Sequence, residues 1–485
     1  MGSRVERAHD RYPVGNHQVS TAQARFLEGS LTRHILTMSS TAAVGFLALF
    51  VVDLVDMVFI SMLGVSELAA AVGFAGSVLF VTTSISIGFS IAAGALVARS
   101  LGEGNSDRAS EVLTHVLMLG FLFGVIFAAV IYANLSALTG LVGAEGETQT
   151  LAVSYLRILI PTMPILMVGM IASAALRSHG AANLSMMVTI IAGVVNAILD
   201  PIFIFVLDMQ LDGAAWASVA ARVSIAATAL WFIFRRFGGL KGASLRQMVK
   251  DFQPIAAIAM PAMLANVATP IGSAYVTRAA AAFGEEAVAG MAVIGRLTPI
   301  AFALIFAMSG AIGPIIGQNF GAGRHDRVRE AFYRSIGLTV AYVGPVVVIL
   351  FLLRAPIADL FNAQGVARDL IFLFCGPLSL AWVFNGIIFI ANASYNNLGH
   401  PFYSTWINWG RNTLGVVPFV AIGASIWGAS GVLIGQMAGG ALVAIVSLWL
   451  AARVMDRSAT TDVAATKDHA FHQDRRTFTI SHHRR

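Results

Sequence analysis

Twelve apolar stretches, each long enough to cross a lipid bilayer, dominate this 485-residue sequence. A spanning helix needs about 20 mainly apolar residues, because the hydrocarbon core is about 30 Å thick. Since a spanning backbone must satisfy its own hydrogen bonds, such stretches form helices. We therefore predict an all-α integral membrane protein. The twelve predicted transmembrane helices begin near residues 34, 68, 109, 149, 182, 213, 254, 286, 330, 367, 401 and 428.

The composition excludes several other classes of protein. Hydrophobic residues make up 57% of the chain and charged residues 12%, whereas soluble domains carry roughly 25% charge. A soluble enzyme is thus excluded, and the net charge of +6 is better explained by membrane topology than by nucleic-acid binding. The single cysteine, Cys375, cannot form an internal disulfide. The polar first segment lacks the short apolar core of a cleavable signal peptide.

The positions of Lys and Arg predict the orientation, because short cytoplasmic loops are enriched in both residues. With the N-terminus inside, connections such as those with Arg99 and Arg235 are cytoplasmic, and acidic ones such as Glu145 face outward. Arg354 and Arg368 are exceptions. We expect a multi-pass plasma-membrane (inner-membrane) protein, monomeric, with both termini in the cytoplasm.

The two halves of the chain are related by an internal repeat. The stretch GALVARSLGEGNSDR from Gly94 aligns with GPIIGQNFGAGRHDR from Gly313, at an offset of 219 residues. Since the offset spans an even number of crossings, both halves have the same orientation. This predicts two pseudo-symmetric six-helix bundles. The predicted parts are a cytoplasmic segment (1–33), an N-lobe (34–236), a linker (237–252), a C-lobe (253–453) and a disordered cytoplasmic tail (454–485).

The repeated glycines fit a structural role. Gly supplies the left-handed conformation at the end of a helix, and the Asp that follows favours the N-cap of the next helix. The repeat therefore supports the architecture rather than a chemical function.

Acidic residues within the apolar stretches break the symmetry of the repeat. Asp53 and Asp56 lie in the first stretch and Asp200 in the fifth, whereas Val276 and Phe419 align near Asp56 and Asp200 in the second half. A carboxylate inside the membrane costs about 2.5–3.5 kcal/mol and marks a site of ion or proton movement. We therefore expect ion coupling in the N-lobe.

Counting residues places these acids at the same depth. Asp56 and Asp200 each precede the outer end of their helix by eight residues, or about 12 Å. Asn196 and Asp200 share a helix face, and Pro201 cannot donate a hydrogen bond to Ala197, which favours a bend. A poorly hydrated niche favours protonated aspartates, and a second carboxylate strengthens that preference. The alternative is a polar pair that only holds two helices together.

Several motifs together resemble those of the multidrug and toxic compound extrusion (MATE) transporters, over essentially the whole chain. The resemblance implies the MATE fold of the MOP superfamily and export of organic cations or amphipathic compounds, driven by proton or sodium influx. The motifs are LVDMVFISMLG around Asp56, GALVARSLGEGN from Gly94, YLRILIPTMP from Tyr155, VVNAILDP at Asn196 and LDGAAWASV from Leu211.

The resemblance also assigns residues. Asp56 matches the first-helix acid of the family, and Asn196 with Asp200 matches the fifth-helix pair of the DinF-like branch. Tyr155 and Ser218 match a supporting tyrosine and hydroxyl, although threonine is more usual at the latter position. Asp53 stands where many relatives have an amide.

One departure concerns the coupling ion. Where the NorM-like branch has a glutamate in the seventh helix, this chain has Asn266 and Thr269, so the sodium-binding acids of that branch are absent. We expect proton coupling with sodium as the alternative, and no metal or cofactor.

Alternative functions remain open at this stage. Arginines in or near the apolar stretches either pair with Asp53 or helix ends, or line a cavity for an anionic substrate, as in the lipid-linked sugar and polysaccharide flippases of the same superfamily. A membrane enzyme would need clustered His, Cys or acids, whereas most histidines lie near the chain ends; a passive channel is a further option. The arginines are Arg157, Arg222, Arg278, Arg296 and Arg411.

Overall fold

The computed structural model describes the backbone of residues 24–63, 66–242 and 244–480. It describes their side chains except at positions 53, 54, 57, 58, 61, 66, 69 and 457–480. The predicted cytoplasmic segment therefore lies mostly outside the described residues, as does the side chain of Asp53.

Within the described residues the chain is helical throughout, without strands. The first half contains α1 (Leu31–Met62), α2 (Ser66–Gly102), α3 (Ser106–Ala133), α4 (Leu135–Leu141), α5 (Gly146–Leu159), η1 (Ile160–Thr162), α6 (Met163–Ser178), α7 (Ala182–Pro201), η2 (Ile202–Val206) and α8 (Gln210–Arg236). The second half contains α9 (Leu245–Ala281), α10 (Glu285–Ala301), α11 (Ala303–Gly321), α12 (His325–Leu360), α13 (Gly365–Cys375), η3 (Pro377–Ala381), α14 (Trp382–Asn397), α15 (Pro401–Gly410), η4 (Arg411–Gly415) and α16 (Val417–Ile480).

The described helices confirm twelve membrane crossings. Eleven continuous helical stretches are long and apolar enough to span a bilayer, and the last of them, Pro401–Asp456, is 56 residues long. Gly428 interrupts this stretch with a non-helical backbone (φ 60°, ψ −137°). Since 56 residues far exceed one crossing of about 20, the stretch provides two crossings, one before and one after Gly428.

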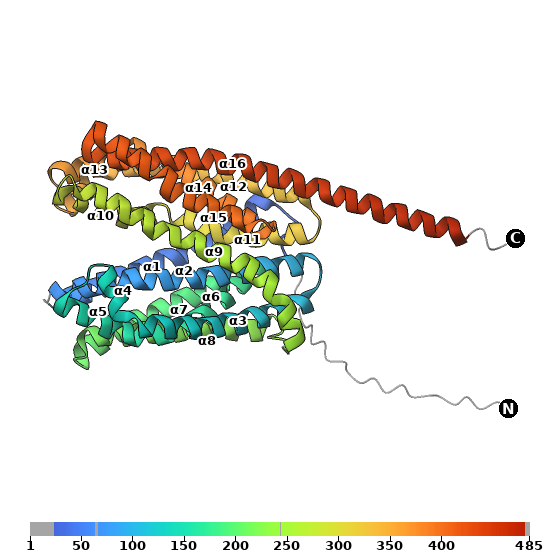
Figure 1. Ribbon diagram of the computed structural model, residues 1–485, viewed down its shortest axis with the longest axis horizontal. Helices are drawn as coiled ribbons and strands as arrows, with labels where there is room; N and C mark the ends of the chain where they lie inside the picture. The colour runs from blue at the N-terminus through green and yellow to red at the C-terminus, as the bar shows by residue number, and fades with distance from the viewer. Residues whose placement is uncertain (1–23, 64–65, 243, 481–485) are drawn as a thin grey trace, which may run out of the picture.

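The helices form two bundles, which face each other across the molecule (Figure 1). Helices α1–α8 lie in the N-lobe and α10–α16 in the C-lobe, while α9 passes between them and packs on α2 and α15. The connection between the lobes is shorter than the sequence predicts: its described residues, 237–242 and 244, are non-helical, and α9 already begins at Leu245.

The first described residues pack with the C-lobe. Phe26, Leu31 and Ile35 are buried in the same apolar cluster as Ile312 and Phe332. The described part of the segment that precedes the first crossing is thus a packed element that joins the two lobes.

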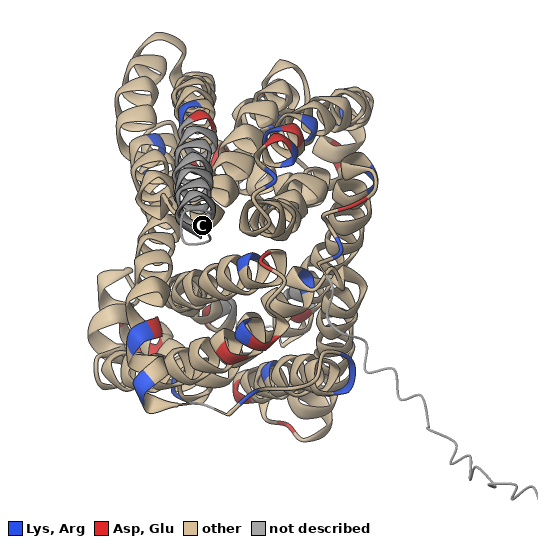
Figure 2. Cartoon of the chain, turned by 90° about the vertical axis from the view of Figure 1, so that its right-hand side faces the viewer, with Lys and Arg blue, Asp and Glu red and all other residues tan. Residues whose placement is uncertain are grey.

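At the end of the molecule where α1 begins, the Gln318 side chain of α11 bonds both the first described residues and the N-lobe (Figure 1). The side-chain oxygen of Gln318 accepts from the backbone N–H of Phe26 at 2.9 Å, and its nitrogen donates to the carbonyl of Ser178 at 2.7 Å. Figure 2, viewed from this end, shows Lys and Arg distributed over both bundles. This end of the interface between the lobes is therefore closed by direct contacts.

The loops after α2 and α11 follow the repeat in their backbone geometry. Gly104 and Gly323 have φ values of +76° and +67°, the left-handed conformation expected of them. The N-cap of α3 differs from the expectation, because Asn105, not Asp107, accepts a hydrogen bond from the N–H of Arg108 at 2.9 Å. Asp107 lies in the first helical turn instead.

The C-terminal segment also differs from the sequence expectation. The backbone of residues 454–480 continues α16 as helix, where the composition predicts disorder. This segment contains neither Gly nor Pro, the two residues that most strongly end a helix.

Candidate functional site

Close packing of α1 and α7 brings together the acids predicted to couple ions. A side chain at Gly45 would touch Met186, and one at Gly193 would lie 3.1 Å from Val52. The residue numbers in both pairs differ by 141, so the two helices run parallel in register. Asp56 is then level with residue 197, and Asp200 lies less than one turn further along α7.

The carboxyl groups of Asp56 and Asp200 lie next to each other. Asp200 is fully buried, and neither of its oxygens has a hydrogen-bond partner among the described residues. One oxygen of Asp56 is also buried without a partner. Two ionised carboxylates only accept hydrogen bonds and repel each other, so this contact is favourable only when at least one of the two carries a proton.

The backbone of α7 changes form directly after the carboxylate. Pro201 is followed by one π-helical turn, Ile202–Val206. This turn is closed by a hydrogen bond from the N–H of Leu207 to the carbonyl of Ile202 at 2.9 Å. π-Helical turns are rare in proteins, and those that occur are often found at functional sites. Asp200 thus lies directly before the irregular part of this helix.

Asn196 lies one turn before Asp200 on the same face of α7. It is only 5% exposed, and its side-chain nitrogen has no partner among the described residues. An unpaired buried amide costs about 1–3 kcal/mol. Asp56, Asp200 and Asn196 thus form a buried polar site, here called the N-lobe niche. It contains unpaired donor and acceptor groups on consecutive turns of α7.

Tyr155 and Ser218 bring a second polar pair from α5 and α8. Their hydroxyl groups lie side by side, and the Tyr155 hydroxyl is within electrostatic reach of Asp56 and Asp200. A neighbouring bond, from Ser154 to Asp212 at 3.1 Å, also joins α5 to α8. The structure thus brings Asp56, Tyr155 and Asp200 into one neighbourhood from three different helices.

Arg222 stabilises the bend of the helix that carries Tyr155. Its guanidinium donates to the carbonyl of Leu159 at 2.8 Å and to the hydroxyl of Thr162 at 2.9 Å. Leu159 directly precedes η1, the short 3-10 turn between α5 and α6, and Thr162 is its last residue. Arg222 therefore bonds a helix end, one of the alternatives that the sequence left open for it.

The other arginines that the sequence leaves open fall into two groups. Arg411 donates to the side chain of Asn385 at 2.8 Å. Arg157, Arg278 and Arg296 are exposed and form no ion pair with any residue that the structure describes.

Sequence reasoning missed a charged cluster at the start of α9. Asp251, assigned to the linker, is 3% exposed; it accepts from the guanidinium of Arg108 and lies 2.7 Å from Nδ1 of the fully buried His115. Arg108 also donates to Glu111 at 2.9 Å. The signal available in the sequence was a histidine inside an apolar stretch, which requires a polar partner.

The described residues contain no group of three or more His, Cys, Asp or Glu side chains that could hold a metal ion. Among the described side chains, the polar groups of the N-lobe niche and of its neighbours Tyr155 and Ser218 are two carboxyl groups, one amide and two hydroxyls. Groups of these kinds can exchange protons or form hydrogen bonds with a ligand.

The internal repeat is also found by comparison with protein families. The MatE family model matches residues 42–202 and again residues 261–422. The two matches together cover more than half of the chain, and each falls on one lobe.

Individual relatives align along nearly the whole chain. An FAD transporter of Shewanella oneidensis is 27% identical over 436 residues, which are 89% of this chain and 96% of the relative. The multidrug export protein MepA of Staphylococcus aureus is 22% identical over 439 residues, again 89% and 96% of the two chains.

Solved structures confirm the fold. A MOP superfamily transporter from Pyrococcus furiosus superimposes with a TM-score of 0.84 at 23% identity, covering 90% of this chain and 99% of that one. At this identity the likeness establishes the arrangement of the helices and not the substrate.

Proposed function

Because the chain belongs to the MatE family, we propose that it is a secondary active transporter that exports organic cations or other amphipathic compounds by proton antiport. The observation that carries the proposal is the buried contact between Asp56 and Asp200, with its unpaired oxygens. The resemblance of the chain to the multidrug exporter MepA supports the same class of substrate.

In the proposed cycle, substrate binds between the lobes while they are open toward the side of the termini. The lobes then rock, so that the bound substrate is open to the opposite side of the membrane. A proton that enters from outside binds to Asp56 or Asp200, which removes the repulsion between them. Helices α1 and α7 then close around Asn196, Tyr155 and Ser218, and the substrate leaves. The lobes rock to the inward state, where the proton is released.

The driving force sets a bound on what such exchange achieves. One proton that crosses about 100 mV yields roughly 2.3 kcal/mol, which supports a gradient of about fiftyfold for a neutral substrate, at about 1.4 kcal/mol per factor of ten. For a monovalent cation exchanged against one proton, the electrical terms cancel and only the pH difference drives export.

The test is transport in proteoliposomes under a pH gradient or a sodium gradient, each imposed separately. We expect the pH gradient to drive uphill movement of a fluorescent organic cation, and Asp56→Asn and Asp200→Asn to lower that flux at least tenfold. Asp208→Asn is the matched control, since Asp208 is exposed and its φ of 53° suits asparagine. Sodium-driven flux, or unchanged flux in both niche variants, would contradict proton coupling.

A second candidate substrate class is a phosphate-bearing nucleotide such as FAD. It is favoured by the exposed Arg278 on α9 and Arg296 on α10, which have no ion-pair partner among the described residues, and by the similarity to an FAD transporter. Counterflow of FAD into loaded vesicles separates the two classes. Flux of FAD that is lost in Arg296→Gln, without flux of the organic cation, would replace the first candidate by the second.

We propose that both termini face the cytoplasm of a plasma membrane, with the chain as a monomer. Support comes from the basic residues of the loops and from the grouping of both described chain ends at one end of the bundles (Figure 1). Labelling of single cysteines introduced at Lys241 and at Glu145 in intact cells tests the orientation, since only the second is expected to react with an impermeant reagent.

A further inference from the structure

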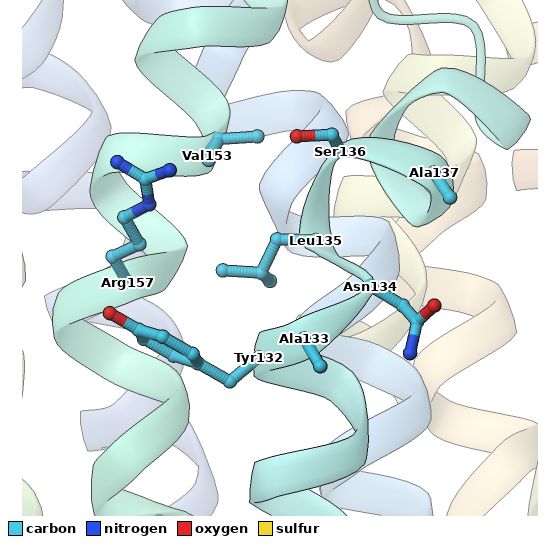
Figure 3. Close-up of a pocket in the computed structure, with 8 residues that line it drawn as sticks. All are labelled: Tyr132, Ala133, Asn134, Leu135, Ser136, Ala137, Val153 and Arg157. Atoms are coloured by element: carbon cyan, nitrogen blue, oxygen red, sulfur yellow. The ribbon is translucent and has the colours of Figure 1, made fainter.

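A cavity of about 410 Å³ lies between the end of α3, the short helix α4 and α5, and its lining includes neither Asp56 nor Asp200 (Figure 3). One wall is formed by Arg157 and Val153 of α5, and the other by Tyr132, Leu135 and Ser136. The transport mechanism proposed above uses none of these side chains.

Arg157 brings an unmatched charge into this cavity. It lies eleven residues after the first residue of α5, Gly146, so its Cα is about 16 Å along the helix. The side chain is exposed and makes no ion pair with a described residue. Its guanidinium extends back toward the start of α5, beside Val153 (Figure 3), as expected for a long cationic side chain that reaches for the membrane interface.

The face of α3 that leads to the cavity is lined by exposed apolar side chains. They recur at helical spacing, and Tyr132 follows them at the mouth of the cavity with 48% of its surface exposed. A stripe of this kind faces lipid chains, and tyrosine is enriched where the chains meet the headgroups. The stripe comprises Phe121, Leu122, Val125, Ile126 and Val130.

We propose that this cavity binds the phosphate of a glycerophospholipid headgroup in the leaflet opposite the termini. The Arg157 guanidinium pairs with the phosphate through two parallel hydrogen bonds, and the hydroxyls of Ser136 and Tyr132 are donors on the other side. The acyl chains lie along the exposed face of α3. An arginine in a membrane span is expensive unless it is paired, and a lipid phosphate supplies the partner that the described protein residues do not.

The position in the C-lobe that matches Arg157 carries no charge. At the repeat offset of 219 residues, the position that matches Arg157 is Gly376, which has no charge to offer. A cavity of about 250 Å³ in the C-lobe is lined by the acidic Glu286 together with Asn362 and Gln364. The proposal therefore specifies one phospholipid per protein.

The test is native mass spectrometry of the full-length protein after delipidation and addition of one lipid at a time. We expect one phosphatidylglycerol per protein, and no retention of diacylglycerol, which lacks the phosphate. Arg157→Gln should reduce retention at least tenfold, and Ser136→Ala severalfold. Arg368→Gln is the matched control, because the Arg368 guanidinium already has a partner in Asp359 at 2.7 Å, and its retention should equal that of the native chain.

Two results would overturn the proposal. One is that Arg157→Gln and Ser136→Ala both retain as much phosphatidylglycerol as the native chain does. The other is displacement of the lipid by millimolar inorganic phosphate, which would make the cavity a site for a free anion. The readout is binding and not transport, so a failed antiport assay leaves this test intact.

Discussion

Gly102 and Gly321 occupy equivalent positions in the two halves of the sequence, and each lies against the backbone of the opposite lobe. A Cβ atom on Gly102 would be 2.1 Å from the carbonyl oxygen of Gln318, and one on Gly321 would be 2.2 Å from that of Arg99. No side chain fits at either place while the lobes touch. The repeat has therefore preserved a two-fold contact that only glycine permits.

This contact makes Gly102→Ala and Gly321→Ala tests of the closed end of the molecule. Each added methyl group meets backbone, which cannot rotate away, so we expect the equilibrium to shift toward the state in which the lobes separate at this end. Distances between spin labels on Asp107 and Arg329 should lengthen. Gly337→Ala is the control, since no atom lies within 4 Å of the added group; a shift of equal size there would refute the steric explanation.

The side chain of Gln318 closes the same end by hydrogen bonds. It is fully buried and bonds both Phe26 and Ser178, so Gln318→Leu leaves a buried N–H and a buried carbonyl unpaired, at about 1–3 kcal/mol each. We expect faster labelling of a cysteine introduced at Ser178 from the cytoplasmic side. Gln364→Leu, at an exposed position of the opposite end, should leave this rate unchanged, and identical rates in both variants would exclude a closing role.

Asp251 should contribute strongly to stability, because it joins α3 to the first turns of α9. Asp251→Ala leaves the fully buried His115 without its hydrogen-bond partner and removes the partly buried pair with Arg108, and an unpaired buried polar group costs about 1–3 kcal/mol. We expect a lower midpoint of thermal unfolding in detergent. Asp107→Ala removes an exposed pair with Lys241 at 2.7 Å, worth about 0–1 kcal/mol. Equal midpoints for the two variants would show that burial does not matter here.

The sequence predicts the architecture and the level of the two acids because both follow from local periodicity. Helix length places Asp56 and Asp200 at one depth, and the repeat offset identifies Gly104 and Gly323 as left-handed residues. The neighbours of α1 do not follow from such counting. The packing at Gly45 and Gly193 shows that α7 lies beside α1.

Pairings between residues distant in the sequence were beyond reach for the same reason. The sequence predicts Asp251 to be part of a polar linker. Its partners Arg108 and His115 lie 143 and 136 residues away, so the local pattern does not reveal them. For Arg222 the sequence left open an acid, a helix end or a cavity, and the fold selects a helix end, the carbonyl of Leu159 at the end of α5. A charge in an apolar stretch signals that a partner exists, and the fold decides which one.

Pro201 offers a test of whether the irregular backbone beside Asp200 matters for coupling. In Pro201→Ala the restored N–H donates to the carbonyl of Ala197, so the π-helical turn at residues 202–206 is expected to revert to α-helix and to rotate Asp200 away from Asp56. The helix itself gains about 3 kcal/mol in intrinsic propensity. We therefore expect proton-driven efflux to fall at least fivefold while the midpoint of thermal unfolding rises or stays constant. Pro345→Ala, in α12 of the other lobe, should leave efflux unchanged. Native efflux in Pro201→Ala would show that the two carboxyl groups meet without the help of the bend.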